Sequence, residues 1–508
     1  MNAFSKRLPT LDEVRRAKAF VDFSYFMDYD SGFKDVPGRH LDVLDKALQD
    51  VSDGRIKRLI VTMPPRHGKS ERVSKKFPAW HLGRNPDDEI ILASYSIDLA
   101  RDHSRIARDT LEKNMDVFGV ALDSDRKSAE SWGIEGHRGG LNAAGVGGPI
   151  TGRGARIGII DDPFKNAEEA ASEVIREKVW QWYQSTFYTR LTPDGRIIIV
   201  MTRWHEDDLV GRLLRKEREE IENGTHTGER WTVINLPAIA EENDYLGREP
   251  GEALWPEFGF DLKRLEEIKK EIGSYFFNAL YQQRPSAADG GMFRRSYFRY
   301  FREEKGFFVL QKDDGVRRVP IALCRWFQTI DTALKTKTTN DYTVIATWCV
   351  TPDKDLLLYD VFRERLEVPE QWPAVQRMRQ RFPQIVFQAV EDKASGTGLI
   401  QTAKRAGKPL RILKADTDKV ARAVRISVMY ENGMVYHKEN APWLDDYENE
   451  LLQFPNGAHD DQVDVASYAG MEAENWSMKW PEPQIDGFYT PTEMEDLGLK
   501  KFEIRKVK

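Results

Sequence analysis

The chain has 508 residues, of which 40% are hydrophobic and 31% are charged, and its formal net charge is −6. This length favours two domains, and the composition fits a soluble globular enzyme. No stretch approaches the ~20 apolar residues of a membrane span, and the N-terminus lacks the apolar core of a signal peptide, so we expect a cytosolic protein.

The cysteine content and the charge limit the kinds of site and partner. Only Cys324 and Cys349 are present, without CxxC spacing, so neither a zinc site nor a disulfide scaffold is expected. The acidic net charge argues mildly against DNA as a partner, because nucleic-acid-binding proteins are often basic. A total charge can hide a local basic surface, so composition leaves the partner open.

The first half of the chain alternates between strands and helices. Residues 11–50 have apolar positions at helical spacing and are predicted to be mainly helical. Apolar strands separated by helices follow, and this alternation predicts an α/β domain with a mostly parallel sheet. The strands are expected at 58–62, 90–94, 157–160, 196–201 and 231–236.

The segment 59–70, LIVTMPPRHGKS, is a β-branched strand followed by a tight turn. The pattern is the second half of a phosphate-binding loop, in which backbone N–H groups and a helix N-terminus hold phosphate oxygens. Lys69 would reach the outer phosphates and the Ser70 hydroxyl would hold Mg²⁺. Met63 stands where the usual pattern has glycine, so a plain surface loop is the alternative. The predicted nucleotide-binding residues of this loop are Pro65, Arg66, His67, Gly68, Lys69 and Ser70.

A second apolar strand ends in two acids, in the segment 156–163, RIGIIDDP. The carboxyl ends of buried parallel strands commonly carry functional residues. Asp161 is therefore predicted to hold Mg²⁺ through water and so to join the cofactor-binding residues. Asp162 is predicted to orient or deprotonate the attacking water. An Asp-Asp-Pro turn without function is the alternative.

A third strand, 196–200, continues into Thr202 and Arg203. These two residues are predicted to sense the terminal phosphate and to pass its loss to the rest of the protein. For Arg203, pairing with a loop carboxylate is an equally compatible role. The glycine-rich segment 139–154 suits a mobile loop beside the nucleotide, and a hairpin with turns suits it as well.

The small-residue stretch 286–292, SAADGGM, predicts a domain boundary. The expected layout is an N-terminal ATPase domain at 1–285, a linker at 286–320, a second domain at 321–479 and a tail at 480–508. The linker contains the basic and aromatic run 294–301, for which a packed linker is favoured over contact with a DNA backbone.

The second domain has a different order of elements. Strands at 325–332, 343–350 and 356–363 should form an antiparallel meander. The elements that follow alternate between helices and strands, and this order is that of a ribonuclease H-like fold. They are expected as a helix at 369–381, a strand at 385–391, a helix at 397–406, a strand at 410–414, a helix from 418 and a last helix from around 459.

Acidic residues occur where that fold needs them. Asp331 ends the first strand, Glu391 ends the fourth, and GAHDDQVDVA supplies Asp460, Asp461 and Asp464. Converging carboxylates repel each other unless cations bind, so the five acids predict a site for two Mg²⁺ or Mn²⁺ ions about 3.5–4 Å apart. Each acid could instead cap a helix or turn. Asp461 is preferred over Asp460 by a small margin.

Together these motifs resemble the large terminase subunit of tailed bacteriophages over nearly the whole chain. The resemblance rests on PPRHGKS, GGLNAAGVGGPITGRG before IIDDP, TRWHEDDL, YQQRP, IDTA, EDKASGTG and HDDQVD. It implies an ATP-driven motor that pumps double-stranded viral DNA into a procapsid in the host cell cytoplasm. It also implies a Mg²⁺- or Mn²⁺-dependent endonuclease that cuts concatemeric DNA.

The same resemblance implies partners: a small terminase subunit, the portal of the procapsid, and further copies of the chain in a ring. In such a ring an arginine of one subunit would complete the next subunit's site, and Arg66, Arg138 and Arg153 are the candidates. Lys393 is a candidate for positioning phosphate. Two other functions remain open: a DNA repair or restriction ATPase–nuclease, and a structural virion protein with a degenerate nucleotide site.

Overall fold

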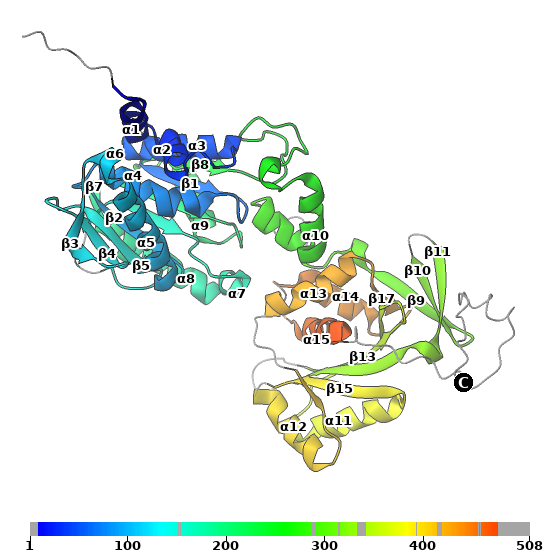
Figure 1. The fold of residues 1–508 in the computed structure, drawn as a ribbon. Helices are drawn as coiled ribbons and strands as arrows, with labels where there is room; N and C mark the ends of the chain where they lie inside the picture. Colours follow the sequence, from blue (N-terminus) through cyan, green and yellow to red (C-terminus); the bar gives the residue numbers. More distant parts are fainter. Residues whose placement is uncertain are drawn as a thin grey trace, which may run out of the picture. The chain divides into compact units, whose positions relative to one another are not determined.

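The computed structural model describes residues 9–150, 152, 154–285, 291–312, 315–332, 342–392, 394–413, 419–455, 457 and 459–475. The chain divides into two compact units, residues 1–287 and 288–508, and each is described by itself (Figure 1). Within the described ranges, no helix is both long enough and apolar enough to cross a membrane.

Unit 1 is built on one eight-stranded sheet with the order β3-β4-β5-β2-β6-β7-β1-β8. The six strands from β5 to β8 in this order are parallel, whereas β3 and β4 add an antiparallel edge. The carboxyl ends of β1, β6 and β7 therefore meet at one edge of the sheet. The strands are β1 (Arg58–Thr62), β2 (Glu89–Ser94), β3 (Leu122–Lys127), β4 (Ser131–Ile134), β5 (Gly140–Gly145), β6 (Ala155–Asp161), β7 (Leu191–Met201) and β8 (Thr232–Asn235).

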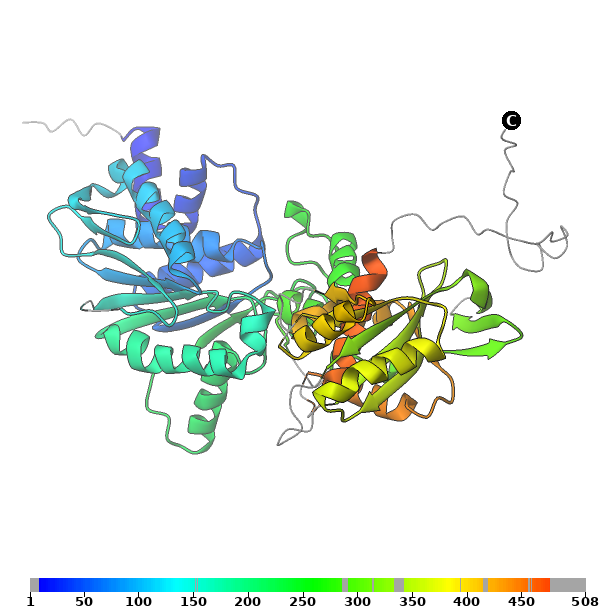
Figure 2. The same cartoon turned by 90° about the horizontal axis from the view of Figure 1, so that it is seen from below.

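Helices cover both faces of this sheet (Figure 2). Along β1, Leu59 and Val61 pack in one cluster with Phe23 of α2 and Trp80 of α4. Ile60 points to the other face and packs in the cluster that contains Trp182. Alternate burial on two faces explains why β1 reads as a continuous apolar run. The helices are α1 (Leu11–Val21), α2 (Phe23–Ser31), α3 (Arg39–Ser52), α4 (Phe77–Arg84), α5 (Ile97–Lys113), α6 (Met115–Phe118), α7 (Ala167–Ala171), α8 (Glu173–Trp182), α9 (Leu209–Glu222) and α10 (Leu262–Phe276).

Unit 2 contains a nine-stranded mixed sheet with the order β11-β10-β9-β17-β14-β13-β12-β15-β16. Strands β12, β13 and β14 form the expected antiparallel meander, and β15 lies parallel to β12. This part has the predicted ribonuclease H-like order. The strands are β9 (Arg299–Glu304), β10 (Phe307–Lys312), β11 (Gly315–Pro320), β12 (Arg325–Asp331), β13 (Thr343–Val350), β14 (Leu356–Glu364), β15 (Ile385–Glu391), β16 (Arg411–Leu413) and β17 (Val435–Lys438).

The helices of unit 2 lie on opposite faces of its sheet (Figure 1). Helices α11 and α12 pack on the face that presents Ile330 of β12. Helix α15 packs on the other face, where the Thr329 hydroxyl donates to the Val465 carbonyl at 2.9 Å. The helices are α11 (Val368–Arg381), α12 (Ala394–Arg405), α13 (Lys419–Glu431), α14 (Leu444–Gln453) and α15 (Asp461–Asn475).

Two sequence-based expectations need correction. Residues 299–320 were expected within a linker, but they form β9, β10 and β11 of the second sheet. The sequence signal was weak because β11 is an edge strand with mostly exposed residues. In the segment 139–154, residues 140–145 form the buried strand β5 rather than a mobile loop; β5 pairs parallel with β2 and, as in the hairpin alternative, antiparallel with β4. Arg153, Lys393 and the tail from 480 lie outside the described residues.

Candidate active sites

The predicted phosphate-binding loop leaves β1 in the interior of the sheet, between β7 and β8. Gly68 has φ +90°, and a Cβ at this position would lie 2.8 Å from the Leu41 side chain, so glycine is required for both reasons. Arg66 also has positive φ, at 64°, and its side chain is exposed. Met63, at the position of the usual first glycine, is fully buried in the core between the sheet and the N-terminal helices.

Lys69 lies at the carboxyl ends of neighbouring strands. Its ammonium group donates to Thr202 Oγ1 at 2.7 Å and lies 3.3 Å from Asp162 Oδ2. The side chain is only 8% exposed, so its position is fixed by these two partners. The structure thus brings together three residues that the sequence predicted from three separate strands.

Asp161 is fully buried and receives hydrogen bonds on both carboxylate oxygens. Ser70 donates to Oδ1 at 3.1 Å and Ser74 donates to Oδ2 at 2.6 Å. His103 Nδ1 lies 3.3 Å from Oδ2. Both serines reach one carboxylate because Ser70 and Ser74 are four residues apart in the helical segment after the loop, where such side chains share a face. Ser74 and His103 were not predicted, since no short pattern marks them.

The electrostatics of Asp161 indicate a place for a cation. Burial, and then the neighbouring Asp162, raise the pKa of Asp161 to about 7. Burial lowers the pKa of His103 to about 4, so this imidazole is neutral at pH 7. The direct partners of Asp161 in the described part of the chain are hydroxyls and a neutral ring. A buried carboxylate in such surroundings, next to the Ser70 hydroxyl, fits Mg²⁺.

Asp162 has a different environment from that of its neighbour. Its side chain is 29% exposed, and its Oδ1 accepts a hydrogen bond from the Thr202 backbone N–H at 2.9 Å. Its φ is 44°, a conformation that non-glycine residues rarely adopt. This conformation turns the chain at the end of β6 and leaves Asp162 Oδ2 facing Lys69.

Arg203 adopts the alternative role that its sequence context left open. Its Nε donates to Asp208 Oδ2 at 2.7 Å, and Asp208 is fully buried at the start of α9. The Arg203 backbone N–H donates to Gln283 Oε1 at 3.2 Å. Residue 203 therefore joins the end of β7 to the last turn of unit 1. Arg66 and Arg138 are the two described candidates for the arginine that one subunit would supply to the next. Both residues are exposed.

A buried aromatic and imidazole cluster supports the loop from outside, and no sequence pattern indicated it. The His67 ring stacks on Phe260 at 4.4 Å between centroids, and His40 Nε2 donates to the His67 carbonyl at 3.1 Å. Burial lowers the pKa of His67 to about 4 and that of His40 to about 3. Both rings are therefore neutral at pH 7.

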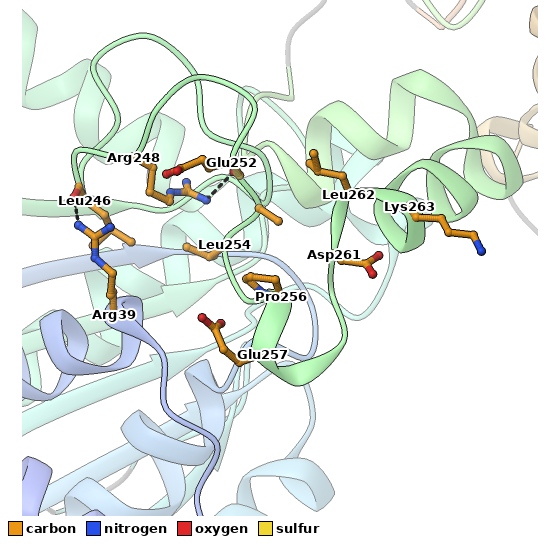
Figure 3. Close-up of a pocket in the computed structure, with 11 residues that line it drawn as sticks. Arg39, Leu246, Arg248, Glu252, Leu254, Pro256, Glu257, Asp261, Leu262 and Lys263 are labelled. Atoms are coloured by element: carbon orange, nitrogen blue, oxygen red, sulfur yellow. Dashed lines mark hydrogen bonds between the residues drawn. The ribbon is translucent and has the colours of Figure 1, made fainter.

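Next to this cluster, the start of α3 and residues 246–263 line an open cavity of about 580 Å³ (Figure 3). Arg39 donates to the Leu246 carbonyl at its edge at 2.7 Å. Arg248 is buried beside it and donates to the carbonyls of Glu252 and Pro237.

In unit 2, the predicted acids come from two strand ends and one helix. Asp331 and Glu391 follow Ile330 and Val390, which are paired in parallel register on β12 and β15. The helix contributes Asp464, which lies in the first turn of α15. Burial and then the charges of Asp464 and Asp461 raise the pKa of Asp331 well above its usual value. These carboxylates are thus close enough to repel one another.

Two basic residues of α13 lie among these acids. Arg422 donates to Asp464 Oδ1 at 2.7 Å and lies 3.7 Å from Glu391 Oε1. Lys419 lies 2.5 Å from Asp460 Oδ1 and 3.1 Å from Asp464 Oδ2. Tyr468 donates to Glu391 Oε2 at 2.6 Å. Neither basic residue was predicted, because both look like ordinary residues of a helix.

Asp461 is placed differently from Asp464. Its Oδ2 is buried without a hydrogen-bond partner, and burial followed by the charges of Glu450 and Asp460 raises its pKa to about 7. Within the described ranges, no three His, Cys, Asp or Glu side chains are already arranged as a metal-binding group. The chemistry of the acids still fits a divalent cation, because oxygen donors repel one another here and one buried oxygen lacks a partner.

Family models match most of the chain, in two consecutive segments. A family model described as the N-terminal part of the T4-like large terminase subunit matches residues 60–299, and a model of the terminase RNaseH-like domain matches residues 328–473. The chain therefore belongs to the large terminase subunits of tailed bacteriophages, and unit 2 contains their ribonuclease H-like domain. Members of this family are DNA-packaging enzymes with an ATPase and a nuclease domain. No curated protein matches the sequence.

Solved structures of large terminases are similar to the chain at low sequence identity. The large terminase of a thermophilic bacteriophage, in complex with ATP-γ-S, is 11% identical with a TM-score of 0.41, and the match covers 85% of this chain and 98% of that one. The HK97 bacteriophage large terminase is 14% identical with a TM-score of 0.30, and the match covers 77% of this chain and 85% of that one. The large terminase nuclease of the thermophilic phage G20c with bound magnesium is 12% identical with a TM-score of 0.25. That match covers 36% of this chain and 97% of the nuclease.

Proposed function

We propose that the chain is the motor and nuclease of a viral DNA-packaging machine. ATP hydrolysis in unit 1 drives double-stranded DNA into a procapsid, and unit 2 cuts concatemeric DNA when packaging begins and ends. The observation that carries the proposal is the meeting of Lys69, Thr202 and Asp162 at the ends of β1, β6 and β7. The separate acid cluster of unit 2 supplies the second activity.

In unit 1, residues 65–70 bind the phosphates of ATP through the loop's N–H groups and Lys69. Ser70 and Asp161 hold Mg²⁺, which neutralises phosphate charge when bound. Asp162 orients or deprotonates the attacking water, because it is the more exposed member of the acid pair. When the terminal phosphate draws Lys69 away, Thr202 loses its bond to Nζ, and the change passes through the backbone of Arg203 to Gln283.

In unit 2, Asp331, Glu391 and Asp461, with Asp460 and Asp464, hold two Mg²⁺ or Mn²⁺ ions. Bound divalent ions stabilise the attacking and leaving oxygens of a phosphodiester. The residues of the chain itself orient that site: Tyr468 fixes Glu391, and Arg422 fixes Glu391 and Asp464 relative to each other.

The partners proposed from family membership are double-stranded DNA, a small terminase subunit and the portal of the procapsid, all in the host cell cytoplasm. A ring of copies on the portal would need an arginine that reaches the next subunit. Arg66 and Arg138 meet the requirement of exposure, whereas the Arg203 side chain is held by Asp208.

The decisive experiment mixes the full-length protein with ATP, linear DNA and procapsids, and measures how much DNA becomes resistant to DNase. Protection by the wild type and its loss in Lys69→Ala support the motor. The matched control is Lys57→Ala, which removes a half-exposed lysine paired with Glu229 before β1. ATPase and cutting without protection would favour a repair or restriction enzyme, and absence of both activities would favour a structural protein.

A further inference from the structure

The acid cluster of unit 2 contains two built-in cations that differ in how firmly they are held. The Arg422 side chain is 1% exposed and is fixed by Asp464 and Glu391. The Lys419 side chain is 41% exposed and reaches Asp460 and Asp464 from the other end of the first turn of α13. One cation is therefore buried in the site, and the other enters it from solvent.

We propose that Lys419 is an exchangeable counter-cation of the nuclease site, which binds Asp464 and Asp460 in the metal-free protein and leaves when a divalent ion binds. The inference rests on the proposed nuclease function of these acids. It assigns Arg422 the opposite role, that of a permanent positioning residue which stays bound to Asp464 in both states.

Chemical properties of the two side chains support this division. Lysine carries a compact charge on a flexible stem, so it can withdraw to water at little cost. The guanidinium of arginine is planar and is held at several points, and removing it from a buried carboxylate would leave an unpaired charge. Asp464 Oδ2 is bound by Lys419, whereas Oδ1 is bound by Arg422, so the two cations use different oxygens of one carboxylate.

Competition follows from the position of Asp464. A divalent ion held between Asp331 and the α15 acids must approach Asp464, whose charge contributes most among the neighbouring charges that raise the pKa of Asp331. A lysine ammonium on Oδ2 competes for the same negative charge. The metal affinity of the site should therefore depend on the residue at 419 even where that residue is not a metal ligand.

The test is calorimetric titration of Mn²⁺ into the full-length protein without nucleotide or DNA. The site's signal is defined as the heat that Asp331→Asn abolishes. Lys419→Met should raise its affinity for Mn²⁺ by about two- to fivefold, because the competitor is gone. Lys419→Arg should lower the affinity, because a bidentate cation is harder to displace. The matched control for charge is Lys408→Met, an exposed lysine of the same unit.

A second readout is thermal unfolding in EDTA. Lys419→Met should lower the melting temperature of the metal-free protein, and Mn²⁺ should restore it, because either cation relieves the repulsion among the acids. Arg422→Gln should lower the melting temperature in both conditions, whereas Arg377→Gln, which replaces an exposed arginine of α11 in the same unit, should change it in neither.

The outcomes separate the inference from the function on which it rests. If Asp331→Asn leaves the Mn²⁺ heat unchanged, the assignment of the nuclease site itself is wrong. A second outcome is that Asp331→Asn abolishes the Mn²⁺ heat while the affinity for Mn²⁺ is the same with Met, Lys or Arg at position 419. In that case the nuclease site stands, and only the exchange of Lys419 for a divalent ion is wrong. A fall in affinity for Lys419→Met would also overturn the exchange, since it would make the lysine a support of the site.

Discussion

The two candidate sites differ in the contacts that their functional side chains make within the protein. At the site of unit 1, Lys69 already contacts Thr202 and Asp162, and Asp161 is held by serine hydroxyls. At the site of unit 2, basic side chains of α13 form ion pairs with the acids that would bind metal. The first site is organised for its ligand, whereas the second is neutralised by the protein itself.

The difference follows from how each site is built. Three parallel strands bring the residues of unit 1 together, so backbone hydrogen bonds fix them in register. The acids of unit 2 come from two strands and a separate helix, and their mutual repulsion must be balanced before any metal arrives. This contrast predicts that substitutions in unit 1 remove an activity cleanly, whereas those in unit 2 also change stability.

The largest expected effect tests whether the two sites are independent. Lys69→Ala should reduce ATP hydrolysis by about 10³-fold, because a buried charge aimed at the phosphates is lost. Metal-dependent DNA cutting by the same full-length variant should stay within about twofold of the wild type in ATP-free buffer. Phosphate release and plasmid cleavage measure the two activities. A parallel loss of cutting would mean that the sites are coupled.

The next effect is the reverse experiment. Asp331→Ala, Glu391→Ala and Asp461→Ala should each reduce cutting by about 10²-fold or more, since each carboxylate holds part of one metal centre. ATPase activity should remain near that of the wild type. Asp460→Ala and Asp464→Ala are predicted to give smaller losses. A larger loss for Asp464→Ala than for Asp461→Ala would contradict the preference for Asp461, and would agree with the contact between Asp464 and Arg422.

Short-range patterns in the sequence predicted many of the strands and several residues of both candidate sites. The positions of β1, β13 and β15 follow from apolar runs, and the ends of β1, β12 and β15 locate Lys69, Asp331 and Glu391. The exact hydrogen-bond partners depend on which strands become neighbours. The bond from Lys69 to Thr202 joins residues 133 positions apart, and no local pattern encodes it.

The missed features have a common physical cause. Strand β11 has mostly exposed residues, and the pairing of β9 and β17 joins segments far apart in the sequence, so no local pattern indicates these strands. Ser74 donates to Asp161 across 87 positions of the chain, so no local pattern pairs them. Lys419 and Arg422 look like ordinary helix residues in the sequence, and only the packing of α13 against α15 gives them a role.

A smaller effect is expected from the more exposed acid of unit 1. Asp162→Asn should bind ATP with nearly unchanged affinity, because Lys69, Ser70 and Asp161 remain, but hydrolysis should fall by about 10²-fold. The amide keeps an oxygen to accept the Thr202 N–H, so the turn after β6 is preserved. Binding of a fluorescent ATP analogue and steady-state turnover separate the two effects. A loss of nucleotide binding would reassign Asp162 to the support of Lys69.

The smallest predicted effect concerns acid pH and one buried imidazole of unit 1, that of His40. The pKa of His40 is about 3 in the folded protein, because burial and the neighbouring His67 disfavour its charge, whereas its unfolded value is about 6.5. The unfolded state therefore binds more protons below pH 6.5. The free energy of unfolding is unaffected by this group above pH 6.5 and falls as the pH drops towards 3, by about 2 kcal/mol at pH 5.

His40→Gln should remove this pH dependence, since the glutamine amide can still donate to the His67 carbonyl but does not titrate. Urea unfolding at pH 8 and pH 5 measures it as the difference between variant and wild type, which cancels the contributions of the acids common to both. His137→Gln, which replaces an exposed histidine of the same unit, is the matched control. If the variant loses as much stability on acidification as the wild type does, His40 is not the buried neutral group beneath the phosphate loop. The acid sensitivity of unit 1 would then have to arise elsewhere.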